Sequence, residues 1–301
     1  MLVNEMTNIM VCGAAGSGAV GGLWNFFARK TGEEDKDWSS DPTGAWKKLK
    51  SSQNVSQVCL PDPASPPAND MVRFVCMSDT HNQTHNLKHP VPDGDVFLHA
   101  GDFTFHGSSA EALRFNDWLG TLPHRHKVVI AGNHEVLLDK DMCSGNIPAD
   151  PERVLSHAIY LHDSAVTLHG IKIYGAPWTP EYHYMAFNLP RGEILREKWS
   201  YIPADTDILM THGPPLGYGD LTWRKHRAGC LDLLSAIQTS VKPSYHVFGH
   251  IHEGYGATTD GHTVFVNAAT CDVHYEPNNP AIVFDVPLPE GFTKPQAPKK
   301  T

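Results

Sequence analysis

Short apolar runs rich in β-branched residues recur along most of the chain, and they constrain its fold more than any other feature. Eight such runs lie at residues 72–77, 95–100, 127–132, 166–176, 207–211, 245–249, 263–268 and 281–286. Helical patterns lie between several of them, and this alternation predicts an α/β fold with mostly buried strands. The length of 301 residues is enough for one large domain of this kind.

Two segments carry the clearest helical patterns, residues 108–122 and residues 230–241. In the first, Ser108 or Ser109 is a suitable N-cap, and the second ends before Pro243. The apolar residues that fall near one face of the first helix are Ala112, Leu113, Phe115 and Leu119.

The chain before residue 71 has a different character. Residues 61–69, PDPASPPAN, form a proline-rich linker, which predicts an N-terminal extension over residues 1–70. Within it, residues 9–28 lack any charge and contain GSGAVG, a formal match to the dinucleotide-binding pattern. No second buried strand follows and glycines interrupt the run, so we expect a flexible extension, with membrane anchoring as the alternative. We expect residues 291–301 to be a disordered tail.

Charge and cysteine usage limit the partners and the compartment. A formal net charge of −9 argues against binding of a nucleic-acid polymer, which usually requires a basic face. It permits a small anionic substrate if metal cations supply positive charge locally. Six scattered cysteines without a Cys-x-x-Cys pair favour a reducing compartment, so we expect a soluble, cytoplasmic protein that is not bound to a membrane. The sequence leaves the oligomeric state open.

The residues that follow five of the apolar runs share one chemistry. Each run is followed by Asp, His or Asn, nearly always beside a glycine or a proline. These residues are Asp79 and His81, Asp102, Asn133 and His134, His212, and finally His250 and His252. Any one of these blocks can be explained as a turn or as a core histidine. Five such blocks at successive strand ends cannot all be explained in this way. A second His-x-His pair, His124 and His126, precedes a strand, so we expect it at the surface of the opposite edge.

This placement predicts a metal centre. The carboxyl ends of strands gather at one edge of an α/β sheet, where ligands bind. Residues i and i+2 of an extended segment point to the same side, so Asp79 with His81, and His250 with His252, can reach one cavity. Mixed carboxylate, imidazole and amide ligands suit Mn, Fe or Zn better than Ca or Mg.

The blocks SDTH (78–81), GDF (101–103), GNHE (132–135), THGPP (211–215) and GHIH (249–252), in this order, resemble the signature of calcineurin-like metallophosphoesterases. Longer runs, among them FNDWLG, YGAPWTP and FNLPRG, resemble the metallophosphoesterase-domain-containing group of that family. The resemblance covers about residues 71–290. SSDPTGAW (39–46) also resembles this group's N-terminal region, so this part of the extension is expected to pack onto the domain.

The resemblance implies a sandwich of two mixed β-sheets flanked by helices, with a dinuclear metal centre at the strand carboxyl ends. By motif, Asp79, His81 and His252 would hold the first metal. Asn133, His212 and His250 would hold the second metal, and Asp102 would bridge the two. His134 would sit beside the scissile phosphate. Some members of the group carry glycine at the position of His250, which weakens the second metal; in this chain the ligand set is complete.

The expected activity is that of a metal-dependent phosphodiesterase acting on small phosphodiesters, cyclic nucleotides among them. Two divalent ions, Mn first with Fe or Zn as alternatives, would generate a bridging hydroxide that attacks phosphorus. His134 would stabilise the transition state or protonate the leaving oxygen. The alternatives are a phosphomonoesterase, including one for phosphoproteins, and a nucleotide-binding scaffold with vestigial activity. Trp178, His183 and Asn188 form either a lid that faces the substrate or a packed loop.

Overall fold

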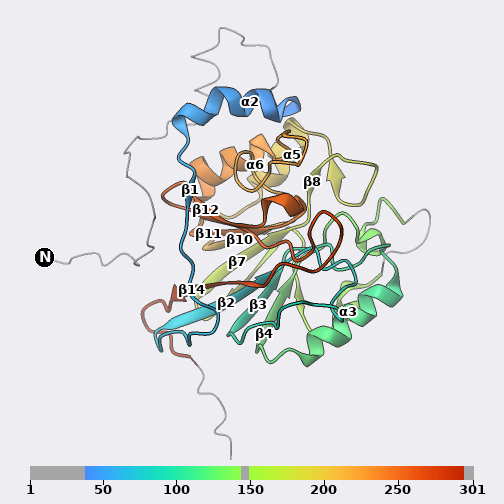
Figure 1. The fold of residues 1–301 in the computed structure, drawn as a ribbon, viewed down its shortest axis with the longest axis vertical. Coiled ribbons are helices and arrows are strands. Elements are labelled where there is room, and N and C mark those ends of the chain that lie inside the picture. Colours follow the sequence, from blue (N-terminus) through green and yellow to red (C-terminus); the bar gives the residue numbers. More distant parts are fainter. Residues whose placement is uncertain (1–37, 144–148, 295–301) are drawn as a thin grey trace, which may run out of the picture.

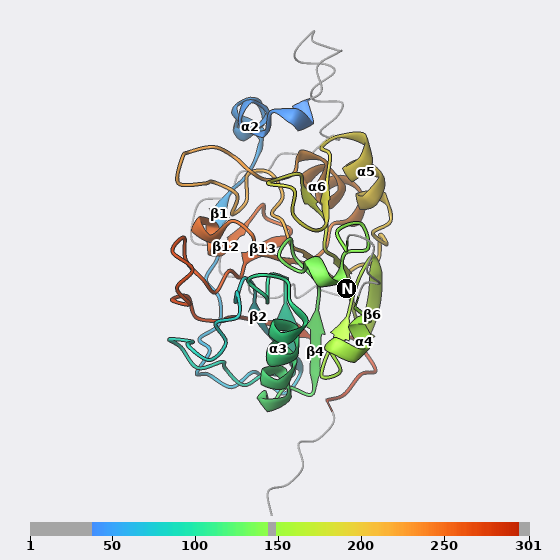
Figure 2. The same ribbon diagram turned by 90° about the vertical axis from the view of Figure 1, so that its right-hand side faces the viewer.

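Two mixed β-sheets pack face to face, with helices on their outer sides, in the computed structural model, which describes residues 38–143 and 149–294 (Figure 1). This is the architecture that the family resemblance implied. The view at 90° shows α3 and α4 on the side of one sheet and α5 and α6 beside the other (Figure 2). Within the described ranges no helix has the length and apolar character needed to cross a membrane. The run at 9–28 lies outside the described residues, as does most of the expected tail.

The five-stranded sheet has the order β14-β2-β3-β4-β5. Its strands are β2 (Met71–Met77), β3 (Val96–His99), β4 (His126–Val129), β5 (Ile159–Tyr160) and β14 (Ile282–Pro287). The four strands from β2 to β5 are parallel, and β14 pairs with β2 in antiparallel register. The carboxyl ends of β2, β3 and β4 therefore lie at one edge.

The seven-stranded sheet has the order β1-β12-β13-β11-β10-β7-β6. Its strands are β1 (Ser56–Gln57), β6 (Ser164–Leu168), β7 (Ile171–Ala176), β10 (Ile208–Thr211), β11 (Tyr245–Phe248), β12 (Gly256–Thr259) and β13 (Val264–Asn267). The central strands β7, β10, β11 and β13 are parallel and the outer ones antiparallel. All eight predicted runs form strands, with 166–176 folding into the hairpin β6-β7. A separate pair, β8 (Thr179–Pro180) and β9 (Asn188–Leu189), lies in a loop.

Helices cover both sheets. The α-helices are α2 (Pro42–Leu49), α3 (Ser109–Thr121), α4 (Pro151–Val154), α5 (Glu193–Ser200) and α6 (Leu231–Ala236). Short 3-10 turns are η1 (Trp38–Ser40), η2 (Lys50–Ser52), η3 (Val136–Leu138) and η5 (His252–Gly254), and the π turn η4 (Ile237–Val241) continues α6. The predicted helix at 230–241 is thus formed by α6 and η4 together.

Burial on both faces explains why the strands read as continuous apolar runs. In β2, Val72 and Phe74 point into the core between the sheets, where Phe74 stacks on Phe284 at a ring distance of 5.3 Å. Val75 and Met77 point the other way, into the core beneath the helices. Alternation of side chains along a strand produces this division, and apolar residues are required on both sides.

Helix α3 begins where the sequence predicted, but one residue that was predicted to lie on its buried face is exposed. Ser108 is the N-cap, and its side chain and that of Glu111 form a capping box. Phe115 and Leu119 are buried, but Leu113 is 47% exposed, so its predicted place on the buried face is wrong. It follows Ala112 by one residue, which is a rotation of about 100° around the helix, and this turns it towards solvent.

Part of the N-terminal extension packs onto the sheets. Trp38, Ala45 and Leu49 are buried in the core beneath the helices, in agreement with the expectation for SSDPTGAW. Figure 1 shows α2 lying over α5 and α6. The domain division near residue 71 stays a prediction.

One expectation about the opposite edge is wrong. His124 is only 2% exposed, because its ring lies 5.5 Å from that of Phe97 and its Nε2 donates to the Pro92 carbonyl at 3.0 Å. The chain around Pro92 therefore covers a histidine that we expected at the surface.

Candidate metal centre

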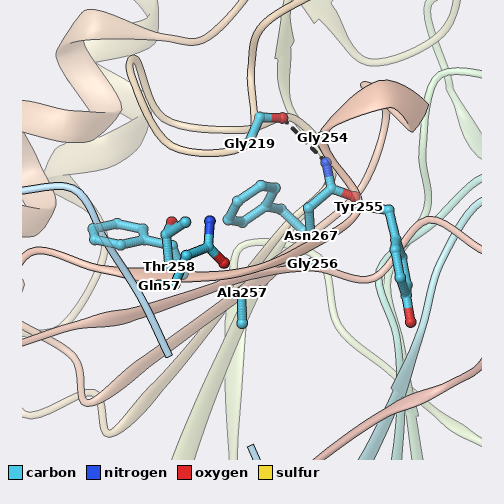
Figure 3. Close-up of a pocket in the computed structure, with 10 residues that line it drawn as sticks. Gln57, Gly219, Gly254, Tyr255, Gly256, Ala257, Thr258 and Asn267 are labelled. Atoms are coloured by element: carbon cyan, nitrogen blue, oxygen red, sulfur yellow. Dashed lines mark hydrogen bonds between the residues drawn. The ribbon is translucent and has the colours of Figure 1, made fainter. Parts of the chain in front are cut away.

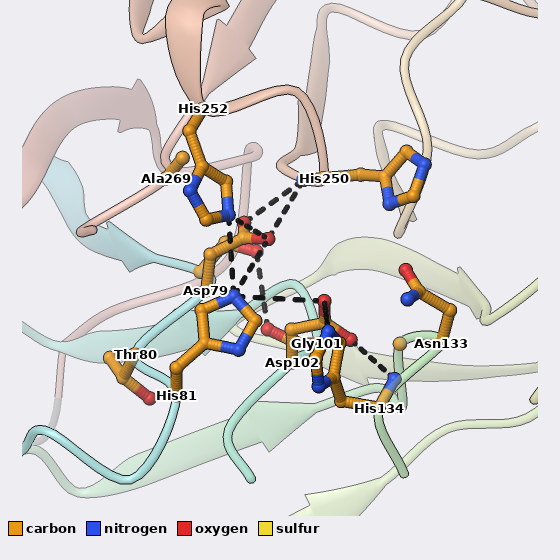
Figure 4. Close-up of polar contacts among 12 residues, drawn as sticks. Asp79, Thr80, His81, Gly101, Asp102, Asn133, His134, His250, His252 and Ala269 are labelled. Carbon is orange, nitrogen blue, oxygen red and sulfur yellow. Dashed lines mark hydrogen bonds and ion pairs between the residues drawn. The ribbon is translucent and has the colours of Figure 1, made fainter. Parts of the chain in front are cut away.

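The side chains that follow five strands meet at one edge of the sandwich (Figure 4). Three strands of one sheet and two of the other supply them. Asp79 and His81 follow β2, Asp102 follows β3, Asn133 and His134 follow β4, His212 follows β10, and His250 and His252 follow β11. Groups of these residues hold ligand atoms within 4.8 Å of one another, which is the spacing of a metal site.

The first group consists of Asp79, His81 and His252. His252 Nε2 lies 3.3 Å from Asp79 Oδ1 and 3.2 Å from His81 Nε2. His81 Nε2 lies 3.9 Å from the same Asp79 oxygen. Two imidazole nitrogens and a carboxylate oxygen therefore surround one point.

The second group is centred on His212. Its Nε2 lies 3.2 Å from Asp102 Oδ2 and 3.0 Å from Asn133 Oδ1, and its ring lies 5.0 Å from that of His250. Asp102 Oδ2 also lies 3.8 Å from His81 Nε2, which belongs to the first group. Asp102 is thus the residue placed between the two groups.

Backbone carbonyls set the direction of three of these rings. Each carbonyl accepts a hydrogen bond from Nδ1, so Nε2 points towards the centre. The pairs are His81 with Thr104 at 3.3 Å, His212 with Ala100 at 2.8 Å, and His252 with Asp272 at 2.8 Å. The Nε2 atoms of His81 and His252 consequently face each other at 3.2 Å, where they can share a proton or bind a cation. The donor set therefore fits divalent cations.

Electrostatics keep carboxylates anionic and two imidazoles neutral here. Burial opposes ionisation of Asp79, but the hydrogen bond and charge of His252 outweigh it and hold its pKa below the usual range. His212 lowers the pKa of Asp102 in the same way. Burial lowers the pKa of His81 to about 4 and that of His250 to about 3, despite the nearby carboxylates. Burial opposes protonation of His212 and His252 as well, but Asp102 and Asp79 outweigh it and raise the pKa of both rings to about 9. Because neutral imidazole and ionised carboxylate are the forms that bind metals, a bound ion would displace a proton from each of these two rings.

The backbone is strained where the ligands are. Asp79, His81, Asp102 and His250 all have positive φ, between 41° and 66°. Such conformations are costly for residues other than glycine and gather at functional sites. The neighbouring glycines allow close approach, because a Cβ on Gly132 would collide with the Asp102 side chain.

A buried carboxylate behind the ligands was not assigned from the sequence. Glu135 accepts hydrogen bonds from the backbone N–H groups of Asp102, Thr104 and Gly132, at 2.8, 2.9 and 2.6 Å. Burial and the charge of Asp102 raise the pKa of Glu135 to about 7. Its position in the GNHE block is the sequence feature that could have indicated it. Its hydrogen bonds join the loop that follows β3 to the loop that follows β4.

Comparisons with known proteins agree with this site. A family model described as calcineurin-like phosphoesterase matches residues 72–254. The chain belongs to this family. Human metallophosphoesterase domain-containing protein 1 is 46% identical over 280 residues, covering 85% of each chain. The Caenorhabditis elegans protein UPF0046 protein C25E10.12 is 43% identical over 270 residues, covering 85% of this chain and 96% of its own.

Among solved structures, a protein of unknown function from Aquifex aeolicus matches 70% of this chain and 95% of its own. The match has 14% identity and a TM-score of 0.33, which is too weak to inform the fold or the function. The family itself establishes the reaction class: the chain is a metallophosphoesterase, a hydrolase of phosphoesters that uses divalent metal ions.

The centre of this metallophosphoesterase opens into a cavity of about 700 Å³. His183 lines it, whereas Trp178 and Asn188 lie outside the lining residues. The Trp178 indole donates to Asp163 at 2.7 Å and lies under Lys198, and Asn188 bonds Thr179 and Tyr182 within its own loop. These contacts favour the packed-loop alternative for both residues, while the role of His183 stays a prediction.

Several lining residues were not predicted from the sequence. They are Tyr182, Trp223, Arg224 and Tyr275, in the loops that follow β7, β10 and β13. The strand-end rule that found the expected ligands applies to these loops too, but the cavity-facing residues lie six or more positions beyond the ends of the central strands β7, β10 and β13. At that distance the path of the loop, rather than the strand, decides where a side chain points.

Proposed function

We propose that this metallophosphoesterase hydrolyses small phosphodiesters, cyclic nucleotides among them. The observation that carries the proposal is the gathering of the seven expected ligand residues at one place, with His134 lining the same cavity. We assign Asp79, His81 and His252 to one ion, Asn133, His212 and His250 to the other, and Asp102 to both. When bound, the two cations would supply positive charge to the phosphate oxygens and would lower the pKa of water near neutral pH.

His134 is the proposed proton-transfer residue. Its backbone N–H donates to Asp102 Oδ1 at 2.8 Å, and its Nδ1 donates to the Phe105 carbonyl at 2.6 Å. Both contacts fix the ring so that Nε2 points into the cavity, 3.9 Å from Asp102 Oδ2. From this position its doubly protonated form can donate a hydrogen bond from Nε2 to a phosphate oxygen or a proton to the leaving oxygen.

The charge around the cavity favours a diester, which carries one negative charge, over a monoester, which carries up to two. The described lining residues include two arginines. The guanidinium of Arg191 donates to the carbonyls of Gly229 and Ala228 at 2.8 and 2.7 Å, and that of Arg224 lies over the Trp223 ring. Neither offers the bidentate grip that a terminal phosphate usually receives.

We assign Mn as the resident metal, with Fe or Zn as alternatives, because the ligands mix carboxylate, imidazole and amide. We also propose a cytoplasmic location. The supporting observation is that Cys76, Cys230 and Cys271 are buried thiols without disulfide partners, as in proteins of reducing compartments.

A substrate comparison tests the proposal. Purified protein loaded with Mn, Zn or Fe is assayed on bis-p-nitrophenyl phosphate and on p-nitrophenyl phosphate, with metal content measured in parallel. We expect a higher kcat/KM for the diester. Faster hydrolysis of the monoester would establish the phosphomonoesterase alternative. Two tightly bound metals without turnover on either ester would establish the scaffold alternative.

A further inference from the structure

One wall of the cavity is a tight turn that the metal chemistry does not use. The Trp223 turn, residues 220–228, follows β10 and is closed by a bridge between Leu221 and Arg227. Trp223 at its tip is 67% exposed, and the guanidinium carbon of Arg224 lies 4.8 Å from the centre of its ring system. A large exposed aromatic beside a cation in a cavity suits a flat aromatic ligand.

The Trp223 turn is joined to the loop that carries two metal ligands. The Trp223 backbone N–H donates to Glu253 Oε1 at 2.8 Å, and Glu253 directly follows His252. Behind the turn, the Asn267 amide donates to the carbonyls of Gly219 and Ile251, at 3.1 and 2.8 Å. Figure 3 shows the first of these bonds at a small cavity. The distance between the turn and the metal centre is thereby held constant.

Helix α2 supports the same turn from the other side. The Arg227 backbone N–H donates to Thr43 Oγ1 at 3.0 Å, and its guanidinium lies 4.9 Å from the centre of the Trp46 ring. The same guanidinium forms an ion pair with buried Asp220 at the start of the turn. The Trp46 ring also covers Gly217, where a Cβ would collide with it. Because α2 lies outside the family match at 72–254, this support comes from the N-terminal segment.

We propose that the Trp223 turn binds the part of the substrate beyond the phosphate, an aromatic ring such as a nucleobase that stacks on Trp223. Trp46 and Arg227 are its positioning residues. The inference rests on the proposed phosphodiesterase function and adds the residues that would hold the organic part of the substrate. Tyr182 and Tyr275 line the same cavity and complete an aromatic surface around the metal centre. Base stacking on aromatic side chains supplies binding without sequence preference, so the turn selects nucleosides as a class.

Two esters with the same leaving group test the binding role. They are thymidine 5′-(p-nitrophenyl phosphate) and methyl p-nitrophenyl phosphate, assayed with metal-loaded protein. We expect a higher kcat/KM for the thymidine ester. Trp223→Ala is expected to lower the ratio of the two kcat/KM values about tenfold, mainly through KM, and Trp223→Phe to retain most of it. A wild-type ratio near one that Trp223→Ala does not change would overturn the inference.

A binding measurement separates this inference from the proposed function. If neither ester is hydrolysed, the phosphodiesterase proposal fails, and thymidine 5′-monophosphate is titrated into metal-loaded protein by calorimetry. Weaker binding to Trp223→Ala than to wild type supports the stacking site without the activity. Equal binding to both proteins contradicts it and leaves Trp223 as a docking point for another macromolecule.

The positioning role of α2 has its own control. Trp46→Ala is expected to lower the thymidine-to-methyl ratio through KM, and Trp46→Phe to restore it, since a phenyl ring keeps the contact with Arg227. Trp118→Ala is the matched variant, because Trp118 belongs to α3 and packs on Phe97 of β3, away from the turn. It should lower the thermal midpoint without changing the ratio. If Trp46→Ala and Trp118→Ala have the same thymidine-to-methyl ratio of kcat/KM, α2 contributes to stability but does not position the Trp223 turn.

Discussion

At the scale of single residues, the centre depends on side chains whose direction is set by the backbone. His81, His212 and His252 each have Nδ1 bound to a backbone carbonyl, so one nitrogen of each ring is committed to the fold. The other nitrogen is available for chemistry. His134 follows the same rule, and it both lines the cavity and belongs with His81 and Asp102 to a third group of ligand spacing. The proposed role of His134 as the proton donor, rather than as a ligand, therefore follows from the family motif and not from its position alone.

Replacement of His134 separates catalysis from metal binding. His134→Ala keeps the backbone N–H that holds Asp102, so metal content should remain at the wild-type level. The loss of the proton donor should lower kcat about 10²- to 10⁴-fold. Steady-state kinetics and metal analysis of the same sample measure both. His106→Ala is the control, since its side chain is 78% exposed and pairs with Glu111 outside the cavity. A wild-type rate in His134→Ala would contradict the assignment.

Replacement of His250 tests the second metal. His250 has a φ of 66°, a conformation that glycine adopts readily, so His250→Gly should leave the loop intact. The backbone N–H that donates to Asp79 is also retained. We expect about one metal per chain instead of two and a large loss of diesterase rate. Retention of both metals and of the rate would remove His250 from the ligand set.

The ligands were predictable from the sequence because they lie within a few residues of strand ends, where the strand itself sets their place. Residues farther along the loops were not. For Trp178 the sequence left a lid and a packed loop as alternatives, and contacts with Asp163 and Lys198 favour the packed loop. Trp223 faces the cavity because Glu253, distant in sequence, holds its backbone. Contacts of this kind join segments whose pairing no local pattern records.

At the scale of the elements, the start of α3 shows what a local pattern leaves open. Ser108 and Ser109 were equally suitable N-caps by sequence. The structure selects Ser108, whose φ of −85° and ψ of 150° are extended, whereas Ser109 is the first helical residue. Two-residue strands such as β1 and β5 were missed for a related reason, since they are shorter than any periodic pattern and form only by pairing with distant strands.

The two serines provide a matched stability test. Ser108→Ala removes the acceptor for the Glu111 backbone N–H and the donor to the Glu111 carboxylate. The free energy of unfolding should fall by about 1 kcal/mol, the usual cost of losing a helix cap. Ser109→Ala should change it by less than about 0.5 kcal/mol, because exposed positions inside a helix favour alanine. Urea denaturation of both variants measures the difference, and equal losses would contradict the cap assignment.

At the scale of the whole molecule, the metal centre joins the two sheets. Asp79, Asp102 and Asn133 come from the five-stranded sheet, and His212, His250 and His252 come from the seven-stranded sheet. Each expected ion therefore has ligands from both sheets. Elsewhere the sheets are held together by apolar packing, for example that of Phe74, Phe284 and Tyr245. Metal binding thus adds a link to the interface that buries much of the core.

Removal of the metals should lower the stability of the entire fold, because ions that bind only the folded state stabilise it. At a metal concentration about 100-fold above Kd, one site contributes about 2.7 kcal/mol, equivalent to about 5–10 °C in the thermal midpoint for a domain of this size. Calorimetric scans of the chelated protein with and without added Mn measure this shift. His250→Gly is the internal control: it should gain less from Mn than wild type, because one of the two sites that span the sheets is impaired. A thermal midpoint that does not respond to metal in wild type would show that the ions do not join the sheets.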